Sequence, residues 1–125
     1  MLFRFLIIFI LLCSCSGQRM TQTDLYFGRS MLNGDTLTEK QWNIFAQQYI
    51  SKVLTNGCTV IDAAGYWYDT AQHHLITEPS RLVVSVNKMS PHFSKQIDSL
   101  RYRYKTLYQQ QSVLRVDRKV KMKLF

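Results

Sequence analysis

The residue with the clearest chemistry is Cys15, which closes the string Leu12-Cys13-Ser14-Cys15 directly after the apolar run of residues 5–12. A secretory signal has a positive start, an apolar stretch of about 7–15 residues and small residues before the cleavage site. Arg4, the apolar run and Ser14 supply these three parts in order. The pattern predicts a lipoprotein signal peptide over residues 1–14. The thiol of Cys15 would then carry a diacylglycerol group, and its freed amine an acyl chain such as palmitate.

Two other interpretations of this segment are weaker. Cys13 follows the bulky Leu12, which suits a lipoprotein peptidase poorly. A transmembrane anchor would need roughly 20 apolar residues to cross about 30 Å of hydrocarbon, and this run is shorter. We therefore expect a chain held by lipid on the bacterial cell envelope, facing the periplasm or the exterior. Ser16 is compatible with sorting to the outer membrane in a host that has one.

The remaining cysteine and the histidines do not form a recognisable chemical motif. With Cys15 acylated, Cys58 is the last thiol of the mature chain, so no intramolecular disulfide is expected, and we expect it to be a small buried hydrophobe. His73 and His74 are adjacent and would point to opposite faces of a strand, and His92 stands alone. The sequence has no glycine-rich phosphate loop, nucleophile elbow or zinc-spaced cysteine pair. We expect no metal and no cofactor.

A group of polar and aromatic residues could form a ligand site if the fold brought it together. Asp62 falls in mid-strand, where aspartate is disfavoured, and a polar residue that breaks a pattern often marks function. The simpler interpretation is that Asp62 and Glu78 form cross-strand ion pairs with Arg81 or Arg115. The full set of candidates is Tyr26, Asp62, Trp67, Glu78, Arg81, Gln110 and Arg115.

The chain is basic, with a formal net charge of +8. Lys119, Lys121 and Lys123 alternate with apolar residues at its end. Lysines placed in this way protect an edge strand from aggregation, or form a positive surface for anionic lipid headgroups, lipopolysaccharide or cell-wall polymers. Nucleic acid is not an expected partner, because an exported protein seldom meets it and the sequence carries no recognition motif.

The elements that must position these residues follow from the apolar pattern. Alternation predicts strands at 23–29, 58–68, 81–86 and 114–124, with residues 15–22 as the lipidated cysteine and a polar tether, and with Pro79 just before the third strand. Thr38 and Gln41 form the capping box of a first helix, which Gly57 ends. Ser90-Pro91 opens a second helix. The apolar stripe of this helix is Phe93, Ile97, Leu100, Tyr104 and Leu107.

This order is β-α-β-β-α-β, which predicts one α+β domain over residues 23–125. It is the ferredoxin-like arrangement, a four-stranded antiparallel sheet with two helices on one face. The other face of the sheet is then bare. Some proteins with this architecture cover that face with a second copy and others bind a partner there, and the fold alone does not choose.

The sequence also resembles a bacterial family known as domain of unknown function 3574. The resemblance rests on the string of residues 23–30, on Trp42 and Phe45, on Glu78-Pro79-Ser80, on the string of residues 110–117, and on Thr59-Val60 with Asp62, Gly65 and Trp67. It implies a small secreted or lipid-anchored protein and supplies no activity. The lysine-rich end is not part of it.

We therefore expect an envelope lipoprotein without enzymatic activity that uses its open sheet face for self-association or for an envelope partner. The alternative is a small periplasmic enzyme or small-ligand binder. Its cleft would be lined by Tyr26, Asp62, Trp67, Glu78, Arg81 and Arg115.

Overall fold

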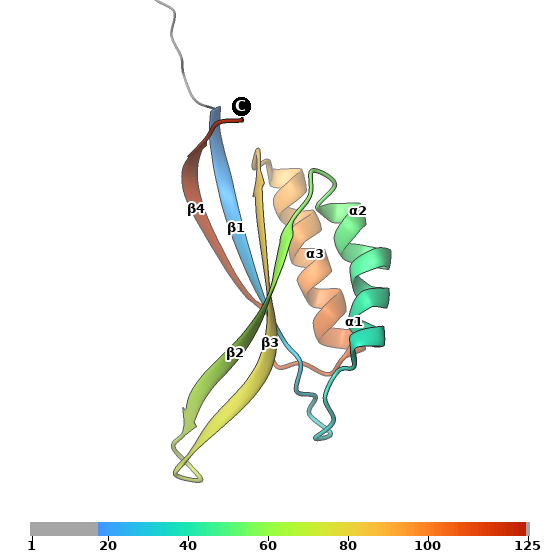
Figure 1. The fold of residues 1–125 in the computed structure, drawn as a ribbon, viewed down its shortest axis with the longest axis vertical. Coiled ribbons are helices and arrows are strands. Elements are labelled where there is room, and N and C mark those ends of the chain that lie inside the picture. The colour runs from blue at the N-terminus through green and yellow to red at the C-terminus, as the bar shows by residue number, and fades with distance from the viewer. Residues whose placement is uncertain (1–17, 125) are drawn as a thin grey trace, which may run out of the picture.

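The computed structural model describes residues 18–124 and has helices on one face of a twisted sheet (Figure 1). In chain order the elements are β1 (Gln18–Gly28), α1 (Glu39–Phe45), the π-helical turn η1 (Ala46–Ile50), α2 (Ser51–Val53), β2 (Thr59–Asp69), β3 (His74–Asn87), α3 (Pro91–Leu107) and β4 (Leu114–Met122). The segments α1, η1 and α2 follow one another without a break. The predicted order of elements is therefore confirmed.

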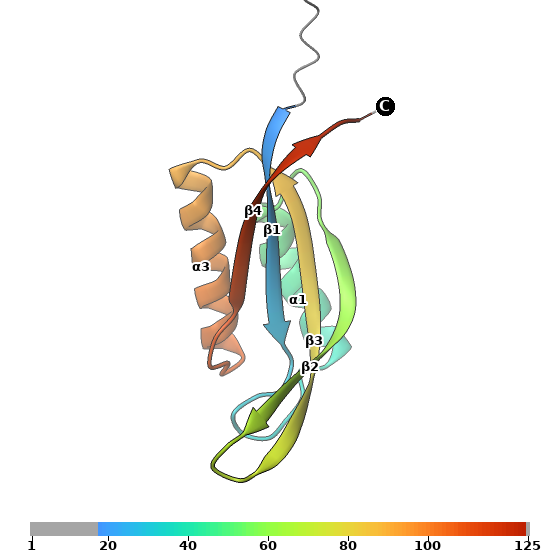
Figure 2. The same ribbon diagram turned by 90° about the vertical axis from the view of Figure 1, so that its left-hand side faces the viewer.

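The sheet has the strand order β2-β3-β1-β4, and all neighbouring strands are antiparallel. The strands β2 and β4 are its edges. Figure 2 views the sheet from the side that carries no helix, with the helices behind it. This is the ferredoxin-like α+β fold that the sequence predicted.

The two helical segments begin where the sequence predicts. The side chain of Thr38 accepts a hydrogen bond from the backbone N–H of Gln41, and the side chain of Gln41 accepts one from the backbone of Thr38, which completes the capping box. The side chain of Ser90 caps α3 by accepting a hydrogen bond from the backbone N–H of Phe93, and Pro91 occupies the first helical position. Gly57 follows α2 with a positive φ of 97°, a conformation that glycine adopts without strain.

The core lies between the sheet and the helices. Leu25, Phe27 and Val83 project from the sheet and are fully buried, and the ring of Phe27 lies 4.7 Å from that of Tyr104 on α3. The other core residues are Leu37, Trp42, Phe45, Ile50, Leu54, Ile97, Leu100 and Val113. Since every core residue lies between Leu25 and Val113, the described domain contains its own core.

Two core predictions are wrong. Leu107 is 49% exposed because it is the last residue of α3, where the helix stops covering the sheet. Cys58 is also exposed, because it precedes β2, which is an edge strand. Partial burial still raises the pKa of the Cys58 thiol above its ordinary value. Cys58 is therefore protonated at neutral pH and is a weak nucleophile.

The first strand starts earlier than predicted. Residues 18–22 belong to β1, where the sequence predicts a tether, and Met20 lies opposite Val120 on β4. The reason is that β4 runs as far as Met122 and offers backbone partners to this segment. The folded domain therefore begins only three residues after Cys15 in the sequence.

The third strand is also longer than predicted, because Pro79 lies within β3 and not before it. Arg29 lies next to Pro79, and its backbone N–H donates to the Pro79 carbonyl at 2.9 Å. The Arg29 carbonyl, which would otherwise pair with an N–H at position 79, accepts from the backbone N–H of Leu37 instead. The missing N–H of Pro79 therefore leaves no acceptor unpaired. The hairpin of β2 and β3 thus extends past the rest of the sheet (Figure 1).

No helix among residues 18–124 is long and apolar enough to cross a membrane. The predicted signal peptide and Cys15 lie outside the described residues.

Candidate functional site

The predicted ligand-binding residues do not converge on one pocket. Directly opposed residues of antiparallel strands point to the same face of a sheet. By this register Asp62 and Arg81 lie on the face toward the helices, whereas Tyr26, Trp67 and Glu78 lie on the open face. Of the remaining two candidates, Gln110 lies in the loop after α3, and Arg115 lies on β4.

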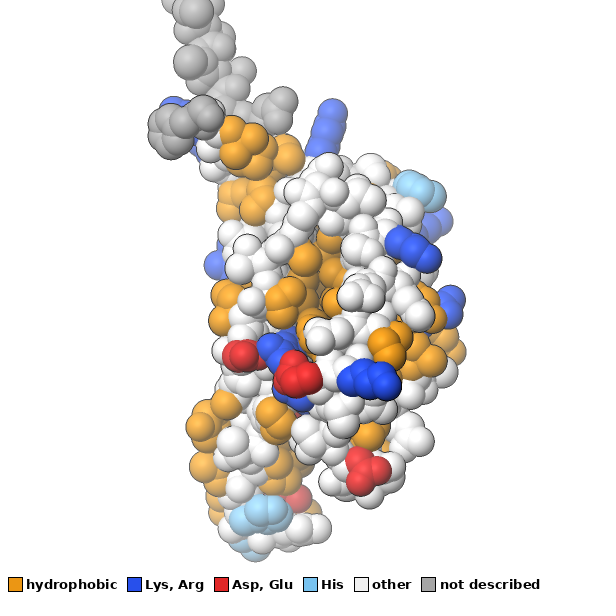
Figure 3. All heavy atoms as spheres, turned by 45° about the vertical axis from the view of Figure 1, so that its right-hand side comes forward, with side chains coloured by type: hydrophobic (Ala, Val, Ile, Leu, Met, Phe, Trp, Pro, Cys, Tyr) orange, Lys and Arg blue, Asp and Glu red, His pale blue; other side chains and the backbone are white. Residues whose placement is uncertain are grey.

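Arg81 joins the sheet to the first helix. Its guanidinium forms ion pairs with Asp62, directly opposite on β2, and with Glu39 in the first turn of α1 at 2.5 Å. It also lies 5.8 Å from the centre of the Trp42 ring. Figure 3 shows acidic and basic side chains in contact near the middle of the molecule in that view. The cross-strand ion pair of Asp62 is thus present, and both residues have structural partners.

Arg115 joins the edge strand β4 to α3. Its guanidinium contacts the carboxylates of Asp98 and Asp117 at 2.9 Å each. Burial opposes ionisation of Asp98, but hydrogen bonds from Arg101 and Arg115 outweigh it and hold the pKa of Asp98 below its usual range. Burial likewise opposes ionisation of Asp117, and hydrogen bonds from Thr23 and Arg115 lower its pKa. This cluster is also fully engaged within the chain.

Glu78 and Gln110 shape the end of β1. The carboxylate of Glu78 accepts a hydrogen bond from the backbone N–H of Ser30 at 3.2 Å, and the amide of Gln110 donates to the Ser30 carbonyl at 2.8 Å. Both side chains press against Gly28, where a β-carbon would lie 2.4 Å from a Glu78 oxygen. On the other side, the buried hydroxyl of Tyr104 donates to the Gly28 carbonyl at 2.7 Å. Sequence reasoning missed this close packing of side chains against Gly28.

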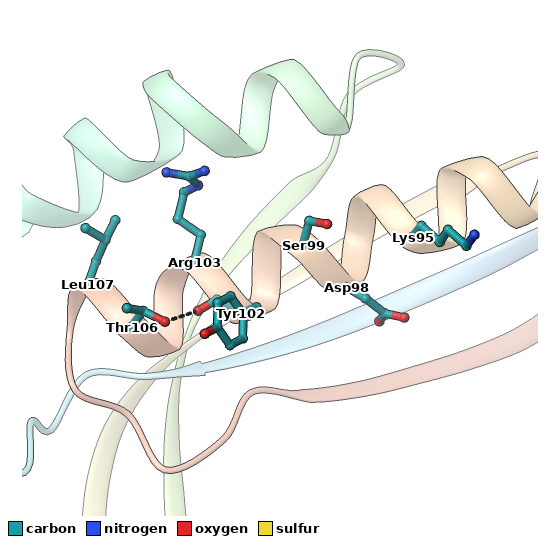
Figure 4. Close-up of a pocket in the computed structure, with 7 residues that line it drawn as sticks. All are labelled: Lys95, Asp98, Ser99, Tyr102, Arg103, Thr106 and Leu107. Atoms are coloured by element: carbon teal, nitrogen blue, oxygen red, sulfur yellow. Dashed lines mark hydrogen bonds between the residues drawn. The ribbon is translucent and has the colours of Figure 1, made fainter.

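A hollow of about 680 Å³ lies along the surface of one helix. It is lined by Lys95, Asp98, Ser99, Tyr102, Arg103, Thr106 and Leu107, all of which belong to α3. Figure 4 shows that Arg103 and Leu107 point toward the other helix, whereas Asp98 and Tyr102 point away from it. A single helix cannot enclose a small ligand, so this hollow does not serve the predicted cleft. Within residues 18–124 no group of three or more histidine, cysteine or acidic side chains could hold a metal ion.

The open face of the sheet carries rows of apolar side chains instead. One row crosses all four strands from β2 to β4 and consists of Ile61, Leu82, Tyr26 and Leu114. Three of its members stay exposed, Ile61 by 46%, Tyr26 by 37% and Leu114 by 56%. Half-buried Val84 and Val116 lie in the next row. Trp67, on the hairpin, is 49% exposed on the same face.

The carboxylate at the centre of this face, that of Asp24, is paired within the chain. The carboxylate of Asp24 is only 5% exposed and lies between Val84 and Val116 in its row. It forms an ion pair with Arg118 and accepts a hydrogen bond from the amide of Gln22 at 2.9 Å. The open face, defined by its rows from Ile61 to Leu114 and from Thr59 to Val116, is therefore apolar with a neutral polar centre.

The family model described as protein of unknown function (DUF3574) matches residues 22–124. The chain belongs to this family. The resemblance inferred from the strings of residues 23–30 and 110–117 is confirmed, and the match covers nearly the whole described domain. No curated protein matches the chain.

Two solved structures share the fold of this family member. A phage SAM lyase in complex with S-methyl-5'-thioadenosine is 12% identical with a TM-score of 0.59, covering 91% of this chain and 98% of the lyase chain. The phage SAM lyase in its apo state is 14% identical with a TM-score of 0.57, covering 86% and 93% of the two chains. At this level of identity the likeness concerns the fold alone.

Proposed function

We propose that this protein is an envelope lipoprotein that associates with a second copy of itself through the open sheet face. The observation that carries the proposal is the exposed row of Ile61, Tyr26 and Leu114 across that face. Exposed apolar patches of this kind mark interaction surfaces, and aromatic residues are enriched in interface cores.

A second copy is favoured over a charged partner because the two central rows of the open face, from Ile61 to Leu114 and from Thr59 to Val116, carry no net charge once Asp24 is paired with Arg118. Asp24 and Arg118 neutralise each other within the chain. Two copies can therefore meet face to face without like-charge repulsion. A strongly charged partner would find no complementary charge on this surface. A different envelope protein with an apolar surface is the competing occupant.

The envelope location is supported by the signal that ends at Cys15. Lipid anchoring would also favour self-association, because chains confined to one membrane meet at a raised effective concentration. A weak dimer in solution would then be a stronger one on the membrane.

Enzymatic activity is not part of the proposal. The polar candidates Asp62, Arg81 and Arg115 are held in ion pairs at two separate places on the helix side of the sheet. The phage SAM lyase shares the fold at 12% identity, and we do not carry its activity over to this chain.

The dimer is tested by placing charge on the open face. The protein tested is the unacylated chain of residues 16–125. The variants Ile61→Lys and Leu114→Lys are each expected to convert its dimer into a monomer. Size-exclusion chromatography with light scattering measures the oligomeric state. Burying a lysine in place of such a side chain forfeits about 1.5–3 kcal/mol of apolar burial. A wild-type chain that stays monomeric at all concentrations would overturn the proposal.

Matched controls exist on the helix side. Ile44 is 41% exposed and Leu107 is 49% exposed, close to the values for Ile61 and Leu114. The variants Ile44→Lys and Leu107→Lys are expected to remain dimeric. Equal dissociation by all four variants would point to a nonspecific effect of added charge.

The anchor is tested separately by mass spectrometry of the full chain expressed in bacteria. We expect the mature amino terminus to be an acylated Cys15, and Cys15→Ser to abolish both processing and attachment to membranes. Unchanged processing and sedimentation of Cys15→Ser would refute the lipoprotein assignment.

A further inference from the structure

Positively charged side chains gather at the end of the domain where β1 begins. Figure 1 places the start of β1, the end of β4, the end of α2 and the start of α3 at one end of the molecule. The exposed cations on these segments are Arg19, Lys52, Lys88, Lys119, Lys121 and Lys123. We call this set the basic end.

Beyond the core, β1 and β4 continue as a two-stranded ribbon. The last pair that β1 forms with β3 joins Thr21 to Asn87, whereas its pairs with β4 continue to Gln18. In the ribbon Arg19 lies directly opposite Lys121, and Lys119 lies opposite Thr21 and donates to its hydroxyl at 3.1 Å. Like charges that face each other across a strand pair are unfavourable unless something neutralises them.

The rest of the basic end adjoins this ribbon. Lys88 directly follows Asn87, which is opposite Thr21. Lys52 and Lys88 line one polar hollow together with Asn56 and Asn87. The cations therefore lie at one end of the domain, from the ribbon to the helix ends.

The carboxylates of the chain do not balance this surface. All eight lie between Asp24 and Asp117 in the sequence, and within residues 18–124 none forms an ion pair with a member of the basic end. The acids closest in register, Asp24 and Asp117, are already paired with arginines. In the view of Figure 3 the red side chains lie in the half of the molecule away from this end.

We propose that the basic end seats the domain on the anionic phospholipid headgroups of the membrane that carries the anchor. The inference rests on the proposed envelope location. Residue 18 opens β1, and three extended residues span at most about 11 Å, so an acylated Cys15 would hold this end at the headgroup layer. The opposed Arg19 and Lys121 would then share lipid phosphates, and the unpaired lysines would gain counter-charges.

The test uses the unacylated chain of residues 16–125, which contains the complete core. Its binding is measured by co-sedimentation with vesicles of phosphatidylglycerol and phosphatidylethanolamine, and with vesicles of phosphatidylcholine alone. We expect binding to the anionic vesicles that weakens with salt, and none to the neutral ones. A chain that binds neither, or that binds purified lipopolysaccharide or teichoic acid but not the anionic vesicles, overturns the proposal.

A matched pair of variants separates a local surface from net charge. Lys121→Gln/Lys123→Gln is expected to lower the partition coefficient about 25-fold, since each lysine near an anionic membrane contributes a factor of about five. Lys40→Gln/Lys105→Gln removes the same charge from the opposite end of the helices. A 17-residue helix is about 25 Å long, and the Debye length at 0.1 M is about 10 Å, so this control should change binding less than twofold.

Equal losses for the two double variants would overturn the proposal, because binding would then follow net charge alone. Light scattering and thermal melting of both variants check that they fold and keep the oligomeric state of the wild type. Failure of Cys15 acylation or of the dimer leaves this measurement unaffected, because the chain tested has no anchor and the substituted lysines lie off the open face.

Discussion

At Gly28, two side chains occupy the space that a β-carbon would need. A Glu78 oxygen would lie 2.4 Å from that carbon, and the Gln110 oxygen 3.1 Å from it. Gln110 is held in place by hydrogen bonds to the carbonyls of Ser30 and Tyr108. Glu78 is the partner that can move, and by moving it would lose its contact with the Ser30 N–H.

We therefore predict that Gly28→Ala lowers the free energy of unfolding by about 1–2 kcal/mol, the sum of overpacking and one lost hydrogen bond. Chemical denaturation measures this change. In a Glu78→Ala background the shortest contact is removed and only the 3.1 Å approach to the Gln110 oxygen remains, so Gly28→Ala should then cost less than it does in the wild type. Equal costs in the two backgrounds would contradict the packing argument.

At the scale of elements, the helices are set by their first turns. Thr38 and Gln41 satisfy each other's backbone groups at the start of α1, and Glu39 in that turn reaches both Arg29 and Arg81. The start of α1 is thereby tied to the residue that follows β1 and to the middle of β3. The capping box was predictable because it is local in sequence, whereas the arginines that meet Glu39 come from residues far along the chain.

Thr38→Ala is expected to destabilise the domain by about 1 kcal/mol, because the backbone N–H of Gln41 in the first turn loses its acceptor, the Thr38 hydroxyl. Ser90→Ala should act similarly at α3, while Thr38→Ser, which keeps the hydroxyl, should stay near the wild type. Thermal melting followed by circular dichroism compares the three. A full loss in Thr38→Ser would show that the methyl group, and not the cap, matters.

At the scale of the whole molecule, charges are distributed unevenly. Arginines of the domain body pair with carboxylates and hold the sheet to the helices, as Arg115 does with Asp98 and Asp117. The cations of the basic end have no such partners within residues 18–124. Ion pairs thus join the sheet to the helices in the middle of the molecule. The basic end, which lies nearest the proposed anchor, keeps a net positive charge.

The acid stability of the molecule should depend on Arg115. Since the pKa values of Asp98 and Asp117 are lowered in the folded state, their contribution is present above the unfolded pKa of about 4 and is lost as the pH falls through the folded values. In Arg115→Gln the pKa values rise toward normal, so the decline in stability below pH 4 should be shallower, though the remaining donors Thr23 and Arg101 keep part of it. Asp98 is 55% exposed, so screening limits the difference to under about 1 kcal/mol. Urea denaturation from pH 2 to 7 measures it, and parallel curves for the two proteins would contradict the assignment.

The order of elements, the helix starts and the family were predictable because each rests on short-range patterns, such as the alternation around Leu25 and Phe27 or the capping box at Thr38. The boundaries of β1 and β3 were not. Residues 18–22 look polar and unstructured in sequence, and they form a strand only because β4 is long enough to pair with them. Pro79 likewise lies within β3 only because β2 pairs with this strand as far as His74.

The sequence by itself determined the ferredoxin-like order, and it predicts the lipid signal at Cys15. In the sequence Leu82, Val84 and Val86 alternate with Arg81, Val83 and Ser85. This pattern assigns the two sets to opposite faces of a strand, but it does not say which face the helices cover. The register with Leu25 decides that Val83 faces the core and that the row of Leu82 faces outward. Only the tertiary structure could separate the ligand candidates and expose an apolar sheet face, because long-range strand pairing sets both.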